Sequence, residues 1–190
     1  IYYTIALCNE FIRNATDDKI GTFSESEQQE LRSMRAEARF LRALAYSHAL
    51  DLFRDIPFVD ESSPVGTYCP PKHTAQQIYD YIVSELSDVA KALPQHPEYP
   101  RAGAAAAYGI LARVYLNAET YGVGKHYDEC VQACKAIFDM GYKTLEPKFT
   151  RLFGADNHKC TDEILFAFAV DNENSVSWGA STYIVCSQCY

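Results

Sequence analysis

The stretch AEARFLRALAYSHALDLFRDIPFV, residues 36–59, decides the fold because it is long, rich in helix formers and free of proline until Pro57. A capping box, Ser24-Glu-Ser-Glu27, precedes it; in this motif the serine and the glutamate each bond the backbone N–H of the other. We therefore predict one helix over residues 25–53. The chain then leaves this helix, without a capping glycine, through a short apolar segment at residues 56–59.

Two rows of side chains follow the predicted helix at helical spacing. The apolar row consists of Leu31, Met34, Ala38, Leu41 and Ala45, and the arginine row of Arg32, Arg35, Arg39 and Arg42. The arginines could form an anion-binding edge, or they could flank the core against aromatic rings and carboxylates of adjacent helices. We favour the second interpretation, because tyrosines are abundant and Glu30 and Glu37 lie close by in the sequence.

Four further helices are predicted, at about residues 1–15, 75–93, 102–118 and 125–140. The second of these begins at a capping box, Thr74-Ala-Gln-Gln77, and ends before Pro94, whereas Gly141 closes the last. The last two helices form a hairpin that resembles a tetratricopeptide unit, in which small residues allow close helix packing. The helices over 25–53 and 75–93 form a similar pair, joined by a long connection at residues 54–73.

The pattern changes after Gly141. Residues 142–145 are β-prone, residues 148–153 could form one helical turn, and residues 163–170 read as a buried strand. The polar stretch DNENSVSWGASTY follows as a predicted loop. The fold class is therefore mainly α: a tetratricopeptide-like scaffold of helical hairpins over about 1–141, followed by irregular loops and a short strand over about 142–190, all within one domain.

The charge and the ends of the chain limit its partners. A net charge of -8 without a basic block makes nucleic acid an improbable ligand, since phosphates would be repelled over most of the surface. No run approaches the roughly 18 apolar residues of a membrane span. Helical periodicity already at Ile5, and an abrupt end after Cys189, are typical of a fragment of a longer protein.

Catalytic and metal-binding motifs are absent from the sequence. The histidines (His48, His73, His96, His126 and His158) are scattered, and the acidic pairs Asp17-Asp18 and Asp60-Glu61 read as solvated loop charges. Cys130 and Cys134, one helical turn apart, are better interpreted as small buried residues than as metal ligands. Cys186-x-x-Cys189 has only the spacing of half a zinc site. We predict no enzyme, no cofactor and no metal site.

Several segments together resemble the SusD/RagB family of outer-membrane glycan-binding lipoproteins. They are Arg35–Tyr46, Asp51–Pro57, Ala106–Leu116 and Glu163–Phe166, with Tyr2, Ile5 and Asn9 fitting a preceding helix. The resemblance implies a central fragment of a non-catalytic protein that binds oligosaccharide or polysaccharide at the cell surface. It also implies delivery to a SusC-like TonB-dependent transporter and attachment to the outer membrane through an N-terminal lipid anchor that lies outside this sequence. A peptide-binding helical-repeat scaffold is the alternative.

The predicted ligand site is the loop around Trp178, the only tryptophan. An exposed aromatic ring can stack on the C–H face of a pyranose, and neighbouring amides and carboxylates can bind its hydroxyl groups. The candidate residues are Trp178, Tyr183, Asn172, Asn174 and Asp171. The alternative is that Trp178 packs in the core beneath the loop.

Overall fold

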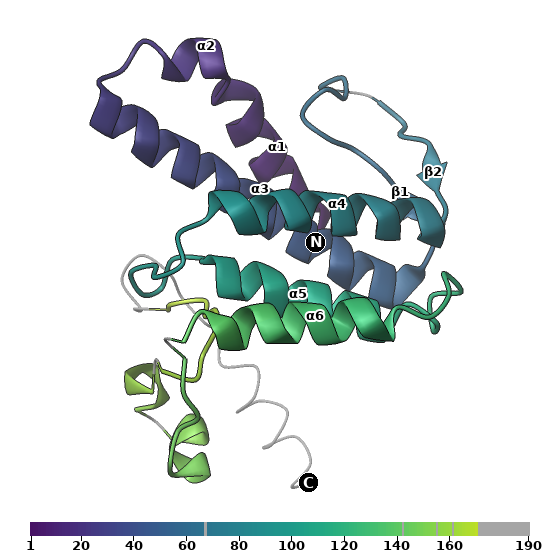
Figure 1. Ribbon diagram of the computed structural model, residues 1–190. Helices are drawn as coiled ribbons and strands as arrows, with labels where there is room; N and C mark the ends of the chain where they lie inside the picture. The colour runs from purple at the N-terminus through teal and green to yellow at the C-terminus, as the bar shows by residue number, and fades with distance from the viewer. Residues whose placement is uncertain (67, 142, 155, 161, 171–190) are drawn as a thin grey trace, which may run out of the picture.

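The computed structural model describes residues 1–66, 68–141, 143–154, 156–160 and 162–170 (Figure 1). Its helices are α1 (Tyr2–Asn14), α2 (Asp17–Ile20), α3 (Glu25–Phe53), α4 (Ala75–Ala92), α5 (Ala104–Leu116) and α6 (Tyr127–Asp139). Two short 3-10 helices follow, at Phe149–Phe153 and Asn157–Lys159. The mainly helical class predicted from the sequence is confirmed, and the turn expected over residues 148–153 is the first of these 3-10 helices.

The predicted helix ends follow from local chemistry. The Ser24 amide donates to Glu27 at 3.0 Å, and at the start of α4 the Thr74 amide donates to the Gln77 side chain at 2.9 Å. Both capping boxes therefore form. Gly141 has a φ of +69°, a left-handed conformation that glycine adopts at little cost, and it follows the end of α6. The short helix α2 was not predicted.

The helices form a layered array in which each long helix packs on the next along the chain (Figure 1). α3 pairs with α4 and α5 with α6, as predicted, while α1 covers the other side of α3. The alanines at the start of α5, Ala104 to Ala107, are all buried, and their small side chains allow the neighbouring helices to approach closely. α1, α2 and the first half of α3 project past the other helices (Figure 1).

The buried face of α3 differs from the predicted apolar row. Leu31, Met34, Ala38 and Leu41 are only partly buried, and Ala45 alone of that row lies in the core. The buried positions of α3 are Ala36, Phe40, Arg42 to Ser47, Ala49 and Leu50. α3 is enclosed by α1 on one side and α4 on the other, so its buried face is broad and is centred on a different side of the helix.

The strand predicted over residues 163–170 is absent. This segment is irregular and only half-buried at Phe166, and the Phe168 side chain is 70 % exposed. Phe166 packs edge-on against Phe40 of α3, with ring centroids 5.1 Å apart, so contacts of side chains and not a backbone ladder hold the segment. Residues 143–145 form no strand either, and Tyr142 lies outside the described residues.

One small antiparallel ladder exists in the described part of the chain. β1 (Ile56–Pro57) pairs with β2 (Lys72–His73), with Ile56 opposite His73. This ladder closes the 54–73 connection into a loop beside α4. The turn from α3 into β1 uses Arg54 in a left-handed conformation, with a φ of 65°, and its guanidinium lies 4.8 Å from the centroid of the Tyr121 ring.

The interpretation of Cys130 and Cys134 as buried residues is wrong. Both are only partly covered, because α6 is the outermost helix and buries mainly Ala133. The cysteines that the structure describes (Cys8, Cys69, Cys130, Cys134 and Cys160) are free thiols. Cys186 and Cys189 lie outside the described residues.

Candidate functional site

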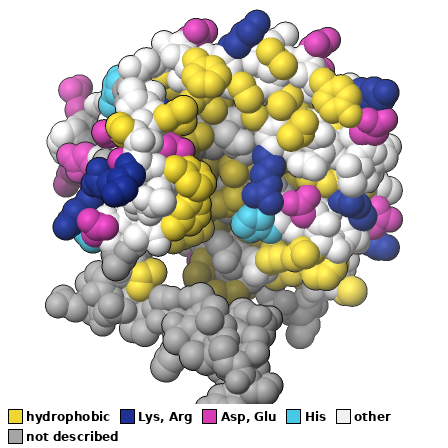
Figure 2. Space-filling view, turned by 90° about the horizontal axis from the view of Figure 1, so that it is seen from below, with side chains coloured by type: hydrophobic (Ala, Val, Ile, Leu, Met, Phe, Trp, Pro, Cys, Tyr) yellow, Lys and Arg dark blue, Asp and Glu magenta, His cyan; other side chains and the backbone are white. Residues whose placement is uncertain are grey.

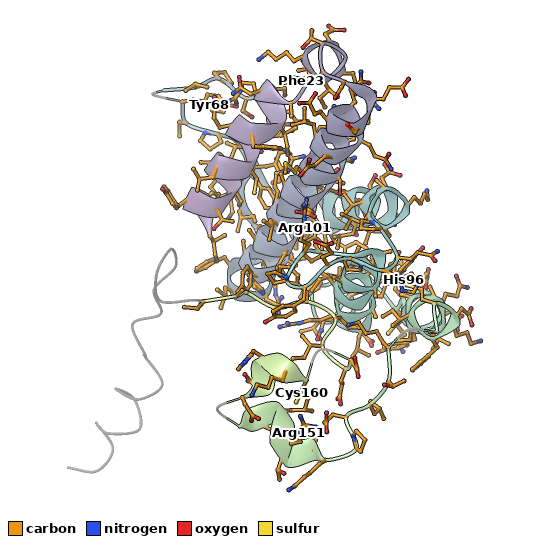
Figure 3. All side chains as sticks on the ribbon, turned by 90° about the vertical axis from the view of Figure 1, so that its left-hand side faces the viewer. Phe23, Tyr68, His96, Arg101, Arg151 and Cys160 are labelled. Carbon is orange, nitrogen blue, oxygen red and sulfur yellow. The ribbon has the colours of Figure 1, made fainter. Side chains whose placement is uncertain are left out.

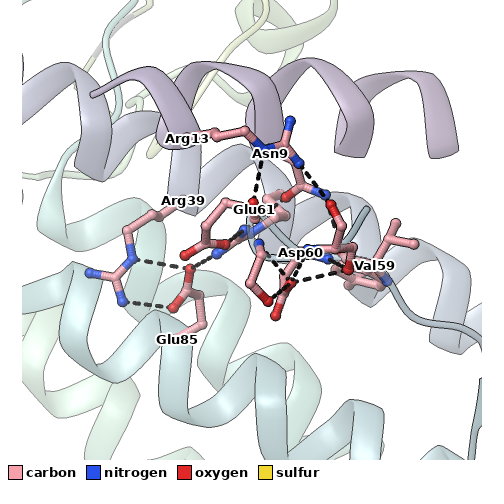
Figure 4. Close-up of polar contacts among 11 residues, drawn as sticks. Asn9, Arg13, Arg39, Val59, Asp60, Glu61 and Glu85 are labelled. Carbon is pink, nitrogen blue, oxygen red and sulfur yellow. Dashed lines mark hydrogen bonds and ion pairs between the residues drawn. The ribbon is translucent and has the colours of Figure 1, made fainter. Parts of the chain in front are cut away.

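Arg39 and Arg42, the last two residues of the arginine row of α3, form a largely buried ionic network (Figure 4). The side chain of Arg42 is 3 % exposed; its Nη1 donates to Asn9 Oδ1 at 2.8 Å and pairs with Glu61, and its Nη2 donates to Glu85 Oε1 at 2.8 Å. Arg39 donates to the same Glu85 carboxylate from Nε at 3.1 Å and from Nη2 at 2.6 Å. The guanidinium of Arg42 also lies 5.8 Å from the Tyr81 ring centroid.

This network holds the 54–73 connection on the helices. Asn9 donates to the Val59 carbonyl at 3.2 Å, and Arg13 Nε donates to the Glu61 carbonyl at 2.9 Å. The Tyr46 hydroxyl donates to the Val59 carbonyl at 2.7 Å. Glu61 is therefore an ion-pair partner and not the solvated loop charge that the sequence predicted.

The pKa values in the network agree with a structural role. Burial alone would raise the pKa of Glu85, but hydrogen bonds from Arg39 and Arg42 outweigh it and hold that pKa below its ordinary value. The Asp60 carboxylate is likewise held below its ordinary pKa, since hydrogen bonds from Ser62 and Ser63 outweigh its burial. Arg39 and Arg42 are therefore paired with carboxylates and flank the core, which is the interpretation that we favoured for the row. Arg35 pairs with Asp17, whereas Arg32 is exposed and bonds Gln28 on its own helix.

A groove of about 260 Å³ is the best candidate for a ligand site in the described part of the chain. It lies between the α4–α5 connection and residues 162–167. Its polar lining residues are His96, Glu98, Arg101, Lys143 and Asp162, and its apolar ones are Pro97, Tyr99, Pro100, Ile164, Leu165, Phe166 and Ala167. In the view of Figure 3, His96 and Arg101 lie above the segment that carries Arg151 and Cys160.

The first wall of the groove is fixed to the helices. Arg101 Nε donates to Glu37 of α3 at 2.8 Å, and the Arg101 amide donates to the Glu98 carbonyl at 2.7 Å. Gly103 lies against Pro97 so closely that a Cβ at this position would be 2.6 Å from the proline Cγ. Three prolines with fixed φ angles, Pro94, Pro97 and Pro100, restrict the same connection. The Tyr99 side chain, which is 49 % exposed, is thus carried by a well-braced turn.

The second wall is braced independently. Lys143 Nζ donates to the Ile164 carbonyl at 2.8 Å, and the Thr144 amide donates to the Asp162 carbonyl at 3.1 Å. Partial burial lowers the pKa of Lys143, while the Asp162 carboxylate opposes this shift. The groove therefore offers a cation, a carboxylate and an accessible aromatic ring within one small volume.

Other hollows have less suitable linings. One of about 770 Å³ is lined by the first half of α3 and the end of α4, and it has no aromatic side chain. A second groove, about 370 Å³, is almost wholly apolar and includes Phe40, Leu44, Ile110 and Phe168. Hydrophobic side chains also border a hollow on the face seen in Figure 2. Apolar surface of this kind is typical of a packing surface for protein.

The ligand site predicted from the sequence stays a prediction. Trp178, Tyr183, Asn172, Asn174 and Asp171 all lie outside the described residues. The groove at Tyr99 was not predicted. Its sequence signal is an aromatic residue between two prolines in His96–Arg101, but its second wall comes from a segment more than 60 residues further along the chain.

Within the described ranges, His, Cys, Asp and Glu side chains form no group of three that could hold a metal ion.

Among the described helices, none combines the length and the apolar character that a bilayer-spanning segment requires.

One known family matches this chain in sequence, and solved structures of its members match it in fold. Residues 2–116 match a family described as SusD-like, starch-binding and associating with the outer membrane. The starch-binding protein SusD of Bacteroides thetaiotaomicron is 34 % identical over 157 residues, which are 80 % of this chain and 28 % of that protein. This chain therefore spans less than a third of the length of that relative. These relatives are binding proteins and not enzymes, in agreement with the non-catalytic role that the sequence predicts.

Solved structures agree with this assignment. A SusD-like carbohydrate-binding protein of Bacteroides fragilis matches with a TM-score of 0.72 at 25 % identity, over 88 % of this chain and 31 % of that one. A laminarin-binding SusD-like protein has the same fold, with a TM-score of 0.66 at 21 % identity over 83 % of this chain and 34 % of that one. The family match covers more than half of the sequence and the helical array has the family's fold. The chain belongs to the SusD-like family.

Proposed function

We propose that the full-length protein binds a glycan at the bacterial cell surface without catalysing its cleavage. The observation that carries the proposal is the family match over residues 2–116, in a family described as starch-binding and associating with the outer membrane. A relative that binds starch and a structural neighbour that binds laminarin support the same ligand class. Family membership, more than any single side chain, is the basis of this function.

Delivery to a transporter is the second part of the proposal. The bound oligosaccharide passes to a SusC-like TonB-dependent transporter, and an N-terminal lipid anchor outside this sequence holds the protein at the outer surface. The described association of the family with the outer membrane supports this location. Co-purification of the full-length protein with such a transporter from detergent-solubilised outer membranes is the direct test, and accessibility to protease in intact cells tests surface exposure.

Two regions are proposed to contact the glycan. One is the loop Asp171–Tyr183, whose residues Trp178, Tyr183, Asn172, Asn174 and Asp171 provide a ring and polar partners. The other is the groove at Tyr99, whose walls are braced by α3 and by Lys143. Pre-organised walls lower the entropy that ligand binding would otherwise cost.

Affinity electrophoresis of the full-length protein tests the glycan proposal. We expect slower migration in gels that contain starch, laminarin, xyloglucan or another polysaccharide than in gels without it, with serum albumin as the control. Retention by no member of a broad panel would contradict glycan binding. A protein that instead captured an unfolded peptide library would be the helical-repeat scaffold considered as the alternative.

A further inference from the structure

We propose that the groove between the α4–α5 connection and residues 162–167 binds one uncharged pyranose ring of a neutral glycan, with Tyr99 as its platform. The inference rests on the proposed function and gives it a ligand class and a place. It concerns residues that lie apart in the sequence from the loop around Trp178.

The first step is the size and the lining of the groove. Its volume, about 260 Å³, lies just below the roughly 300–1,000 Å³ of pockets for drug-sized ligands, so it suits a single small ring. The lining alternates apolar surface, including Tyr99, Pro97 and Phe166, with charged side chains. A pyranose also combines apolar and polar surface, because its C–H faces are apolar and its hydroxyl groups lie around the edge.

The second step is the rigidity of the platform. The turn that carries Tyr99 is held by the Arg101–Glu37 ion pair at 2.8 Å and by the contact of Gly103 with Pro97. Tyr99 itself remains half-exposed. A ring held in this way loses little conformational freedom when a sugar stacks on it.

The third step is the charge of the groove, which selects against acidic sugars. Its two cationic side chains, Arg101 and Lys143, are matched by two carboxylates, Glu98 and Asp162. Arg101 is already paired with Glu37. A uronic acid polymer would be repelled by the chain's net charge of -8, while gaining no excess of cations in the groove.

Hydroxyl groups suit this balanced lining. A hydroxyl can accept from the Lys143 ammonium and donate to the Asp162 carboxylate, and so it uses both charges without adding one. The contact of Arg101 with Glu37 uses the Nε nitrogen. Within the described part of the chain, the two Nη nitrogens of Arg101 make no hydrogen bond. They are available as further donors to sugar oxygens.

The test uses the full-length protein in gels that contain starch, laminarin, xyloglucan or alginate, at several concentrations of each. We expect retention by at least one of the neutral glycans. Tyr99→Ala is expected to raise the dissociation constant for that glycan about tenfold or more, the loss typical of a central aromatic contact. Tyr99→Phe keeps the ring and is expected to bind like the wild type. Asp162→Ala removes an exposed carboxylate from the groove. This variant is expected to bind the glycan more weakly as well.

Tyr3→Ala is the matched control, since Tyr3 is 77 % exposed on α1 and lies outside the groove. Equal melting temperatures of all variants show that the fold is intact. Unchanged affinity of Tyr99→Ala in a protein that binds a neutral glycan would overturn the groove site alone. Retention by alginate in place of the neutral glycans would overturn the ligand class, and retention by no glycan would overturn the proposed function itself.

Discussion

Glu85 Oε1 lies 2.8 Å from Nη2 of Arg42, and this contact joins α4 to α3 inside the helical array. Neither side chain is more than 10 % exposed. Two charges at this depth stabilise the fold only as a pair, because each alone would carry a large desolvation penalty. Substitution of one member of the pair is therefore expected to lower the stability of the fold strongly, because the other charge stays buried without its partner.

Glu85→Ala is expected to lower the free energy of unfolding by roughly 3–5 kcal/mol, since it leaves the buried Arg42 with a poorer set of partners. Urea denaturation followed by circular dichroism measures this change. Arg32→Ala is the control, because Arg32 is exposed and bonds only Gln28 on its own helix; we expect a change within about 0.5 kcal/mol. Equal effects of the two substitutions would show that the network is not important for stability.

Stability is expected to fall in acid partly through Glu85. Its pKa is depressed in the folded state, so its contribution is complete above the unfolded pKa of about 4.3 and is lost as the pH falls through the lower folded pKa. The difference in unfolding free energy between the wild type and Glu85→Gln should therefore be constant above about pH 5 and shrink below it. A difference that grew in acid would contradict the depressed pKa.

Gly103→Ala is expected to destabilise the protein, because the new methyl group would lie 2.6 Å from Pro97 Cγ and 3.0 Å from the Pro94 carbonyl oxygen. Overpacking of this kind costs about 1–3 kcal/mol. Gly109→Ala is the contrast: its Cβ would meet only the mobile end of Leu165, at 3.0 Å, and alanine favours the helix. Thermal melting of both variants distinguishes these outcomes, and equal stability would contradict the tight packing of the α4–α5 connection.

Thiol labelling should follow exposure. Cys69 is exposed and is expected to react with iodoacetamide first, and Cys130 and Cys134 should follow. Cys8 should react only after unfolding, since burial both covers it and raises the pKa of its thiol, although Arg42 opposes that rise. Peptide mapping by mass spectrometry identifies each site. Rapid labelling of Cys8 in the native protein would show that α1 separates readily from α3.

Trp178→Ala is expected to weaken retention of the full-length protein by its polysaccharide sharply and to leave the melting temperature nearly unchanged. The reason is the polar sequence around this ring, which contains Asn172 and Asn174 and no apolar periodicity. Affinity electrophoresis and thermal melting of the same samples give both quantities. Unchanged retention with a large loss of stability would assign Trp178 to the core.

Sequence patterns predicted the helices well because their ends depend on neighbours in the chain. Ser24 and Thr74 cap their helices through residues three positions away, and Gly141 ends α6 through its own backbone. The depth of Arg42 could not be predicted in the same way. It depends on Glu61 and Glu85, which come from a later loop and a later helix and cover the arginine only after folding.

The candidate groove shows the same limit. Tyr99 could be found as an aromatic residue in a proline-rich connection, but nothing local indicates that Lys143 and Asp162 lie across from it. The strand expected at residues 163–170 was inferred from β-prone residues alone. Such a segment needs a partner with which to form a ladder, and in the described part of the chain Phe166 packs on α3 instead.

The stacking of each helix on the next has a consequence for how the chain reaches its native state. Most of its contacts join segments that are close in sequence, an arrangement of low contact order that favours rapid folding. During synthesis, α3 and α4 can associate before α6 has been made. The ionic network follows the same order, since Asn9 must wait for Arg42, 33 residues later, and Arg42 for Glu85, 43 residues later again. Its ion pairs are therefore expected to close after the hairpin of α3 and α4 has begun to form, so that they secure an early helical pairing and do not initiate it.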